Sequence, residues 1–184
     1  MATRPVPRND ALCRRNLLPL LLLPPLAACG FQPLYAGGRD GTMGPAEADL
    51  AAVDVGIIPD RSGQLLRQAL QARFERGAAG LARRYDLNVA LFISNEGIAT
   101  LPNSANTRVR LIATASWTLK AQDPQRTTLD TGVARSVDGF NIIDEQFFAA
   151  DIEQEAGQRR LTQALADQIV LQLAIYFKRH PASA

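Results

Sequence analysis

Cysteine and histidine are scarce in this chain of 184 residues, which holds two cysteines, Cys13 and Cys29, and one histidine, His180. Both cysteines lie in the first 29 residues, so the rest of the chain has no thiol for a disulfide, a zinc site or a nucleophile. His180 lies close to the last residue, where a solvated tail residue is expected rather than a general base. These shortages exclude a His-based triad, a zinc site and a thiol nucleophile.

Motifs for phosphate binding and for nucleophilic catalysis are absent as well. The sequence contains no G-x-x-x-x-G-K-[ST], no G-x-G-x-x-G and no G-x-S-x-G segment. Asp151 and Glu155 stand one helical turn apart just before Arg159 and Arg160, a pattern typical of a solvated helix face. We therefore predict no enzyme, no catalytic residue, no metal site and no cofactor.

A large excess of one charge sign is also missing, because the formal net charge is +2. Four arginines and one aspartate precede residue 29, which leaves 16 basic against 17 acidic groups in the remainder. Nucleic-acid-binding proteins normally carry a clear basic surplus, so no nucleic-acid partner is expected. The length of 184 residues fits one ordinary domain of about 150 residues plus an extra segment.

The extra segment is the N-terminus, which has the layout of a secretory leader. Residues 1–16 hold the four arginines, residues 17–26 are apolar apart from prolines, and Ala27, Ala28 and Cys29 follow. The apolar stretch up to Ala28 covers roughly 18 Å as a helix, too short for a hydrocarbon core of about 30 Å. The cysteine after two small residues resembles a bacterial lipobox, which predicts acylation of Cys29, for example with palmitate.

Two alternatives stay open for this leader. Cys29 can be a chance cysteine near an ordinary cleavage site, and the pair Arg14-Arg15 is compatible with twin-arginine export as well as with the general route. The predicted organisation is a signal peptide at 1–28 that is removed, a lipidated N-terminus and flexible tether at 29–49, a folded domain at 50–180 and a tail at 181–184. The glycine-rich composition of residues 36–49 favours the tether.

The folded domain begins with strand and helix patterns. Val53, Val55 and Ile57 alternate with polar or small residues and predict a first strand. A helix should follow, capped by Asp60 or Ser62, with an apolar stripe at its centre and Arg67 on its outer face. The next strand is expected over residues 85–94, followed by a loop over 95–106.

The second half of the domain predicts two more strands and a long helix. Apolar residues from Val109 to Leu119 alternate with polar residues from Arg108 to Lys120, which predicts a strand with one buried face. A turn at 123–126 should lead into an antiparallel strand over 128–137, closed by Asp138-Gly139. Residues 145–178 carry apolar side chains every four residues and predict a helix, loosened near Gly157.

This order of elements, β-α-β-β-β-α, predicts an α+β fold. A sheet with one polar face needs its helices on the other face, so we expect a two-layer sandwich. It should contain a mixed sheet of about four strands, covered on one face by two helices, with a polar face left open. That uncovered face is the expected functional surface.

A row of basic side chains is the most unusual feature of the predicted open face. It comprises Arg108, Arg110 and Lys120, joined by Arg135 on the next strand and by the pair Arg83-Arg84. Arginine forks match the geometry of phosphate and carboxylate groups, so this row could receive anionic lipid headgroups or acidic residues of a partner. The alternative is that these residues only keep a polar face soluble.

Four stretches of the chain, at residues 29–35, 107–115, 140–143 and 165–177, resemble the LptE family of lipopolysaccharide-assembly lipoproteins, in particular its alphaproteobacterial branch. Cys29–Tyr35 reads C-G-F-Q-P-L-Y, like the start of the mature family members. Thr107–Ala115 resembles the family's third-strand motif. Phe140–Ile143 stands where the family has a Tyr-Asn-Val type segment, with Phe140 in place of the usual tyrosine. Residues 165–177 resemble the terminal helix.

The resemblance implies a non-catalytic, lipid-anchored protein on the periplasmic face of the outer membrane. Family members plug an LptD-type β-barrel translocon, help to assemble it and take part in lipopolysaccharide transport. Basic residues of the family are linked to lipopolysaccharide binding, and Arg108, Arg110, Lys120 and Arg135 are candidates here by surface chemistry alone. Alternatives from other classes are a lipoprotein that regulates a cell-wall synthase across the periplasm and a periplasmic hydrolase.

Overall fold

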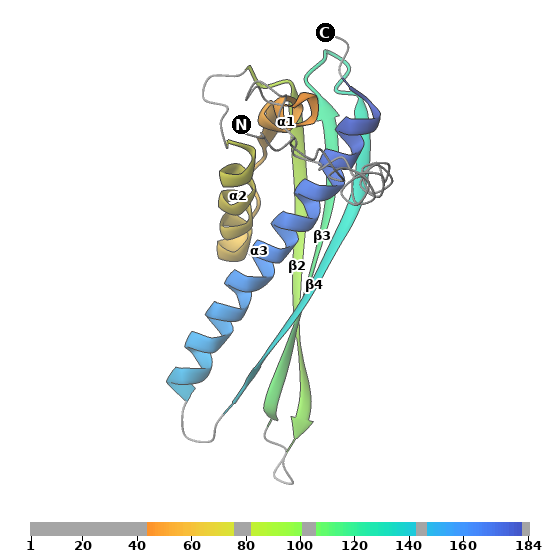
Figure 1. Cartoon of the computed structure of the whole chain (residues 1–184). Coiled ribbons are helices and arrows are strands. Elements are labelled where there is room, and N and C mark those ends of the chain that lie inside the picture. Colours follow the sequence, from red (N-terminus) through yellow and green to blue (C-terminus); the bar gives the residue numbers. More distant parts are fainter. Residues whose placement is uncertain (1–43, 76–81, 101–105, 143–146, 182–184) are drawn as a thin grey trace, which may run out of the picture. The chain divides into compact units, whose positions relative to one another are not determined.

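The computed structural model describes residues 44–75, 82–100, 106–142 and 147–181 (Figure 1). Its elements run in the order α1 (Pro45–Ala51), β1 (Val53–Val55), α2 (Asp60–Phe74), β2 (Tyr85–Thr100), β3 (Asn106–Ala121), β4 (Thr128–Asn141) and α3 (Phe147–Arg179). The predicted series of one strand, one helix, three strands and one helix is confirmed, and a short helix precedes it.

The four strands form one mixed sheet in the order β1-β2-β3-β4. β1 pairs with β2 in parallel, while β2 with β3 and β3 with β4 are antiparallel. A parallel pair needs a long crossover connection, which α2 supplies between β1 and β2. The antiparallel hairpin predicted for the last two strands is present.

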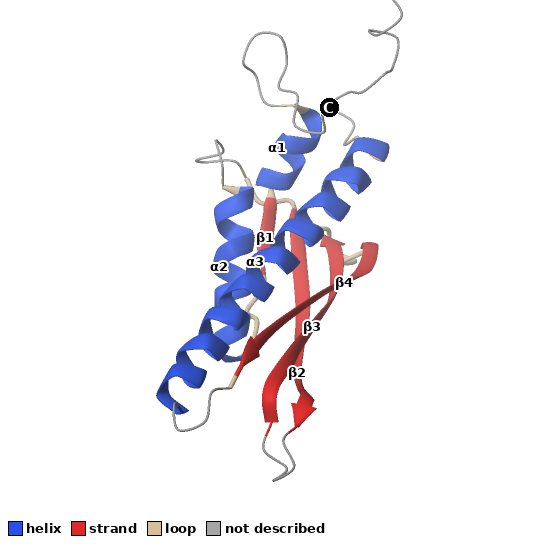
Figure 2. Ribbon diagram, turned by 60° about the horizontal axis from the view of Figure 1, so that its bottom comes forward, coloured by secondary structure: helices blue, strands red, loops and turns tan. Residues whose placement is uncertain are grey.

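All helices of the described part pack on one face of this sheet (Figure 2). The residues of β3 that point toward them are buried, from Leu111 to Leu119 in steps of two. In α3, the apolar residues spaced by four are at most 1% exposed: Leu161, Leu165, Ile169, Leu173 and Phe177. The two-layer α+β sandwich is thereby confirmed, because one helix-covered sheet face holds the apolar core.

Helix α1 corrects the predicted tether, which was expected to extend to Asp49. The helix starts with Pro45 at its first turn, where proline's missing N–H costs nothing, and it buries Leu50 and Ala51 in the core. Seven residues are too few for a helical periodicity to show in the sequence, so composition alone suggested a loop. Residues 45–49, predicted as part of the tether, therefore belong to the packed domain.

A buried carboxylate holds α1 to the sheet. Asp49 is 3% exposed, forms an ion pair of 2.5 Å with Arg84 and accepts a hydrogen bond of 3.3 Å from the Tyr85 hydroxyl. Burial of the Tyr85 ring, together with the negative charge of Asp49, raises the pKa of Tyr85 above its ordinary value. Arg83 adds to this junction by donating hydrogen bonds to the carbonyl oxygens of Ala51 and Val53.

Several element boundaries also differ from the predictions. The loop expected over 95–106 is largely strand, since β2 runs to Thr100 and β3 starts at Asn106. The fourth strand passes through Asp138-Gly139 to Asn141, which brings Phe140 into the core. In both places strand pairing supplies backbone partners to segments whose polar sequence suggests a turn.

The end of β1 and the start of α2 also differ from the predictions. β1 ends at Val55, so Ile57 is 87% exposed and Ile58 is buried instead. α2 follows Pro59 at its N-cap without any side-chain cap, so neither Asp60 nor Ser62 has the predicted capping role. Arg67, placed on the solvated side, is half-buried and donates a hydrogen bond to the carbonyl oxygen of Val55.

Helix α3 is continuous through Gly157, contrary to the predicted loosening there. Gly157 is buried against β3, and a Cβ at this position would lie 2.8 Å from Leu111 Cδ1. The glycine thus serves the close approach of helix and sheet rather than a break in the helix.

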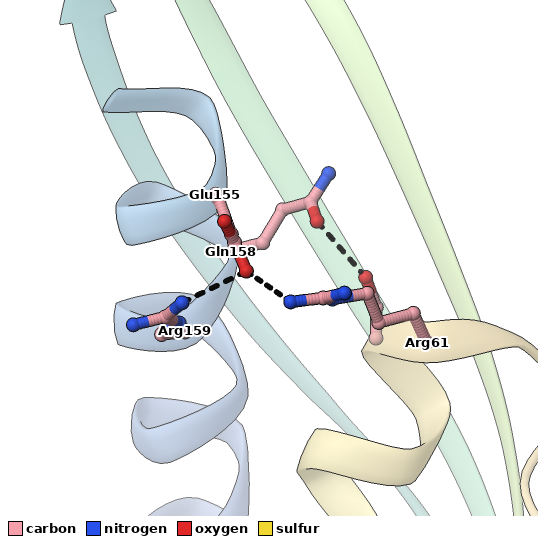
Figure 3. A network of polar contacts seen from close by, with 5 residues as sticks. Arg61, Glu155, Gln158 and Arg159 are labelled. Atoms are coloured by element: carbon pink, nitrogen blue, oxygen red, sulfur yellow. Dashed lines mark hydrogen bonds and ion pairs between the residues drawn. The ribbon is translucent and has the colours of Figure 1, made fainter. Parts of the chain in front are cut away.

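Polar side chains tie the first turn of α2 to α3 (Figure 3). Glu155 accepts hydrogen bonds from Arg61 and, at 2.8 Å, from Arg159, while Ser62 donates to Gln158 at 3.3 Å. The hydrogen bond from Arg159 and the charges of both arginines lower the pKa of Glu155. The carboxylate pair Asp151 and Glu155 thus lies on an exposed helix face, and Glu155 links the two helices.

The single tryptophan is fitted against a glycine of the neighbouring strand. Gly132 stands directly opposite Trp117, and a Cβ on Gly132 would lie 2.5 Å from Trp117 Cζ2. The indole cannot easily yield, because its Nε1–H donates a hydrogen bond of 2.8 Å to Gln172 Oε1.

Replacing Gly132 by alanine should therefore lower the free energy of unfolding by about 1–3 kcal/mol through overpacking. Val133→Ala, on the exposed side of the same strand, serves as the control and should change stability by about 0.5 kcal/mol. Chemical denaturation followed by the fluorescence of Trp117 measures both variants. Equal stabilities would contradict the close fit of the ring.

Replacing Asp49 by alanine should lower stability by about 1–3 kcal/mol, because it removes a charge-assisted hydrogen bond and the buried partner of Arg84. Glu47→Ala, in the first turn of the same helix, keeps the buried contacts and is the matched control. Thermal unfolding of both variants is the measurement. An unchanged thermal stability of the Asp49→Ala variant would contradict the packing of α1 and would favour the predicted tether for residues 45–49.

Candidate functional site

The sheet face that points away from the helices is called the open face. Its residues alternate with the buried ones along β2, β3 and β4, and on β3 they are Arg108, Arg110, Ile112, Thr114, Ser116, Thr118 and Lys120. Side chains of successive strand residues point to opposite sides, so this set follows directly from the buried series between them. The predicted open face thus exists over three long strands.

The four predicted basic residues all lie on the open face but do not form one cluster. Arg108 and Arg110 sit near the β2–β3 hairpin end, and Arg135 lies opposite Thr114, four residues further along β3. Lys120 is ten residues from Arg110, which corresponds to about 33 Å along a strand. A single small anion cannot contact all four, whereas an extended or multivalent anionic ligand can.

The four basic residues differ in whether a carboxylate lies close to them. Arg110 lies opposite Glu96 and forms a half-exposed ion pair of 3.8 Å with it. Lys120 lies opposite Asp86, whose carboxylate is already paired with Arg126 at 2.6 Å. Within the described ranges, no carboxylate lies within ion-pair distance of Arg108 or Arg135. Arg108 and Arg135 are therefore the candidates with the fewest internal competitors.

An apolar patch occupies the centre of the open face and corrects the expectation of a purely polar surface. Phe92, Val133 and Val137 are 70%, 57% and 54% exposed, and Ile112 lies directly opposite Val137. Register places Arg135 between the two valines on β4. The sequence did contain a signal for this patch. Val133 and Val137 are four residues apart and so share a strand face, and Phe92 and Ile112 are apolar residues in the polar series of their strands.

Arg83 and Arg84 do not belong to the basic row. Both are engaged at the start of β2, Arg83 with backbone carbonyls and Arg84 with Asp49. Their role is to attach α1, which was invisible as a helix in the sequence. This part of the predicted basic surface is wrong.

Other predicted features lie elsewhere. His180 stacks on Tyr176 with 4.6 Å between ring centroids, at the exposed end of α3. Among the residues that the structure describes, no group of three His, Cys, Asp or Glu side chains could hold a metal ion. No helix in the same part combines the length and hydropathy needed to cross a bilayer. Cys29 and the leader lie outside the described residues.

A comparison with protein families identifies the family of the folded domain. The family model described as LptE, Lipopolysaccharide-assembly, matches residues 50–173, from the end of α1 to the last third of α3. The chain belongs to the LptE family. The matched range covers Thr107–Ala115, Phe140–Ile143 and the terminal helix up to residue 173, so the resemblance to this family is confirmed, whereas the C-G-F-Q-P-L-Y start lies outside the matched range. A search of curated proteins gives no match.

Solved structures agree with the LptE family fold. A crystal structure of a protein described as a lipoprotein from Caulobacter crescentus has 22% identity and a TM-score of 0.59, covering 77% of this chain and 98% of the other. Rare lipoprotein B from Shewanella oneidensis has 12% identity and a TM-score of 0.50, with coverages of 70% and 96%. A minor lipoprotein from Acinetobacter baumannii has 13% identity and a TM-score of 0.50, with coverages of 67% and 90%. At these identities the likeness concerns the fold alone.

Proposed function

We propose that this LptE-family chain is a non-catalytic outer-membrane lipoprotein that plugs an LptD-type β-barrel, helps to assemble it and takes part in lipopolysaccharide transport. The observation that carries the proposal is the family match over residues 50–173, which includes all four strands of the sandwich. The lipobox-like sequence before Cys29 adds a lipid anchor, since two or three acyl chains suffice to hold a protein on a membrane.

The distribution of apolar residues suits a plug. The lumen of a large transmembrane barrel is polar and filled with water, so a domain inside it must bury its own core. Here the core lies between the sheet and its helices, and the described residues leave no buried side-chain polar atom without a partner. The domain therefore needs no lipid or partner to complete its interior, and its outer surface is available for the barrel wall.

The open face suits contact with lipopolysaccharide. Arg108, Arg110, Arg135 and Lys120 spread over the length of β3, as a ligand with several separated phosphates would require. The exposed side chains of Phe92, Val133 and Val137 lie between them. Cationic contacts at this face would loosen lipopolysaccharide aggregates, while the body of the domain keeps the lumen closed to solutes.

Replacing Arg108 and Arg110 by glutamate should weaken lipopolysaccharide binding about tenfold or more, since each substitution removes a charge-assisted hydrogen bond and adds repulsion. Thermal stability should change little, because exposed charges contribute little to folding. The matched control is Lys178→Glu with Arg179→Glu, which changes net charge equally at the exposed end of α3. Binding is measured by surface plasmon resonance on immobilised lipopolysaccharide, and equal losses in both pairs would assign the effect to net charge alone.

Replacing Cys29 by alanine should abolish acylation and release the protein from the membrane fraction. Mass spectrometry of the intact protein detects the acyl chains. Capture of the wild-type protein from solubilised outer membrane should recover a β-barrel in a ratio near one to one. Recovery of a cell-wall synthase instead of a barrel would favour the alternative, and an acyl-free wild-type protein would overturn the anchor.

A further inference from the structure

β4 forms one edge of the sheet, so alternate peptide groups along it point away from β3. Such an edge normally presents free N–H and C=O groups that can pair with a strand of another molecule. The central segment of β4, residues 132–137, is rich in valine and carries exposed side chains at Val133 and Val137. This composition makes an open edge prone to strand addition.

Two glutamines of α3 bind outward peptide groups of this segment at Val133 and Arg135. Gln168 accepts a hydrogen bond of 3.2 Å from the Arg135 amide and donates one of 3.1 Å to the Arg135 carbonyl oxygen. Gln172 donates a hydrogen bond of 3.2 Å to the Val133 carbonyl oxygen. The side-chain amide of Gln168 thus makes both bonds that a residue of a neighbouring strand would make.

The spacing of helix and strand makes this arrangement possible. Gln168 and Gln172 are four residues apart on α3, a rise of about 6 Å, while Val133 and Arg135 are two residues apart on β4, a rise of roughly 6.7 Å. The two repeats nearly coincide, so one helix face can follow the strand edge. Trp117 fixes the second glutamine by donating its indole N–H to Gln172 Oε1.

Aspartates occupy two more amides of the same edge. The amide of Thr131 donates to Asp130 Oδ1 at 2.9 Å, and that of Gly139 donates to Asp138 Oδ1 at 2.7 Å. Asp138 is also bound by Arg160 of α3 at 2.6 Å. Although partial burial opposes its ionisation, the bonds from Arg160 and Gly139 lower the pKa of Asp138. The outward amides at 131, 135 and 139 are therefore all engaged by side-chain oxygens.

We propose that α3 closes the β4 edge with side-chain amides in place of a fifth strand, so that this edge accepts no strand from a second copy of the chain. At this edge the chain then forms no sheet with a second copy, and it contacts other molecules through side chains rather than through added strands. This property goes beyond the proposed function, and it holds whether or not the partner is a β-barrel.

The test replaces both glutamines by methionine, Gln168→Met with Gln172→Met, in the full chain purified in detergent. Methionine keeps the volume and flexibility of glutamine but removes the amide. The matched control is Gln158→Met with Gln163→Met, which adds the same apolar surface on the α2-facing side of the helix, where Gln158 contacts Ser62 (Figure 3) and Gln163 contacts Arg73.

Two measurements are made on each variant. Hydrogen exchange of the Arg135 amide should become about tenfold faster in the edge variant and stay unchanged in the control. A labelled synthetic peptide with the sequence of residues 128–141 should bind the edge variant and neither the wild type nor the control, with a scrambled peptide as reference. Light scattering should show the edge variant associating at concentrations at which the control is monomeric.

An unchanged Arg135 exchange rate would overturn the proposal, because the glutamines would then not cover the edge. Faster exchange without peptide binding or self-association would also overturn it, since the edge would then be closed by something else. Peptide binding to the wild type would show that the edge is open. If the double variant fails to fold, Gln168→Met alone, which keeps the bond between Trp117 and Gln172, enters the same assays with the same expected direction.

Discussion

The structure depends on the burial of one apolar stripe of α3 against one face of the sheet. From Leu161 to Phe177 this stripe is almost wholly removed from water, and the facing residues of β3 are equally buried. Burial of apolar area stabilises a fold by roughly 25 cal/mol for each Å² removed from water, so this contact is a large favourable contribution to folding. The positions of α1 and α2 follow from it, because both pack around the same core.

The two edge strands of the sheet have peptide groups that point outward, and side chains bind some of these groups at both edges. At β4 the glutamines of α3 and two aspartates engage the outward groups. At β1 Arg67 and Arg83 donate to the carbonyl oxygens of Val55 and Val53. Polar residues that look solvated in the sequence thus supply hydrogen-bond partners to peptide groups at the edges of the sheet.

The candidate site was predictable as far as it lies on single strands. Alternation along β3 placed Arg108, Arg110 and Lys120 on one face, because strand periodicity fixes direction without knowledge of partners. The apolar patch around Arg135 was not predicted, since it joins Phe92, Ile112 and Val137 from three strands and depends on register. Arg83 and Arg84 were assigned to the surface because their partners belong to β1 and to α1, a helix too short to be recognised.

The sequence by itself determined the α+β class, the order of the long elements, the buried faces of β3 and α3, and the family to which the chain belongs. Each of these is encoded in local periodicity or in short contiguous motifs. The tertiary structure alone decided where β2 and β4 end, that residues 45–51 form a helix, and which polar side chains close the β4 edge. These features arise between residues far apart in the chain, as from Arg135 to Gln168, and local patterns carry no information about such contacts.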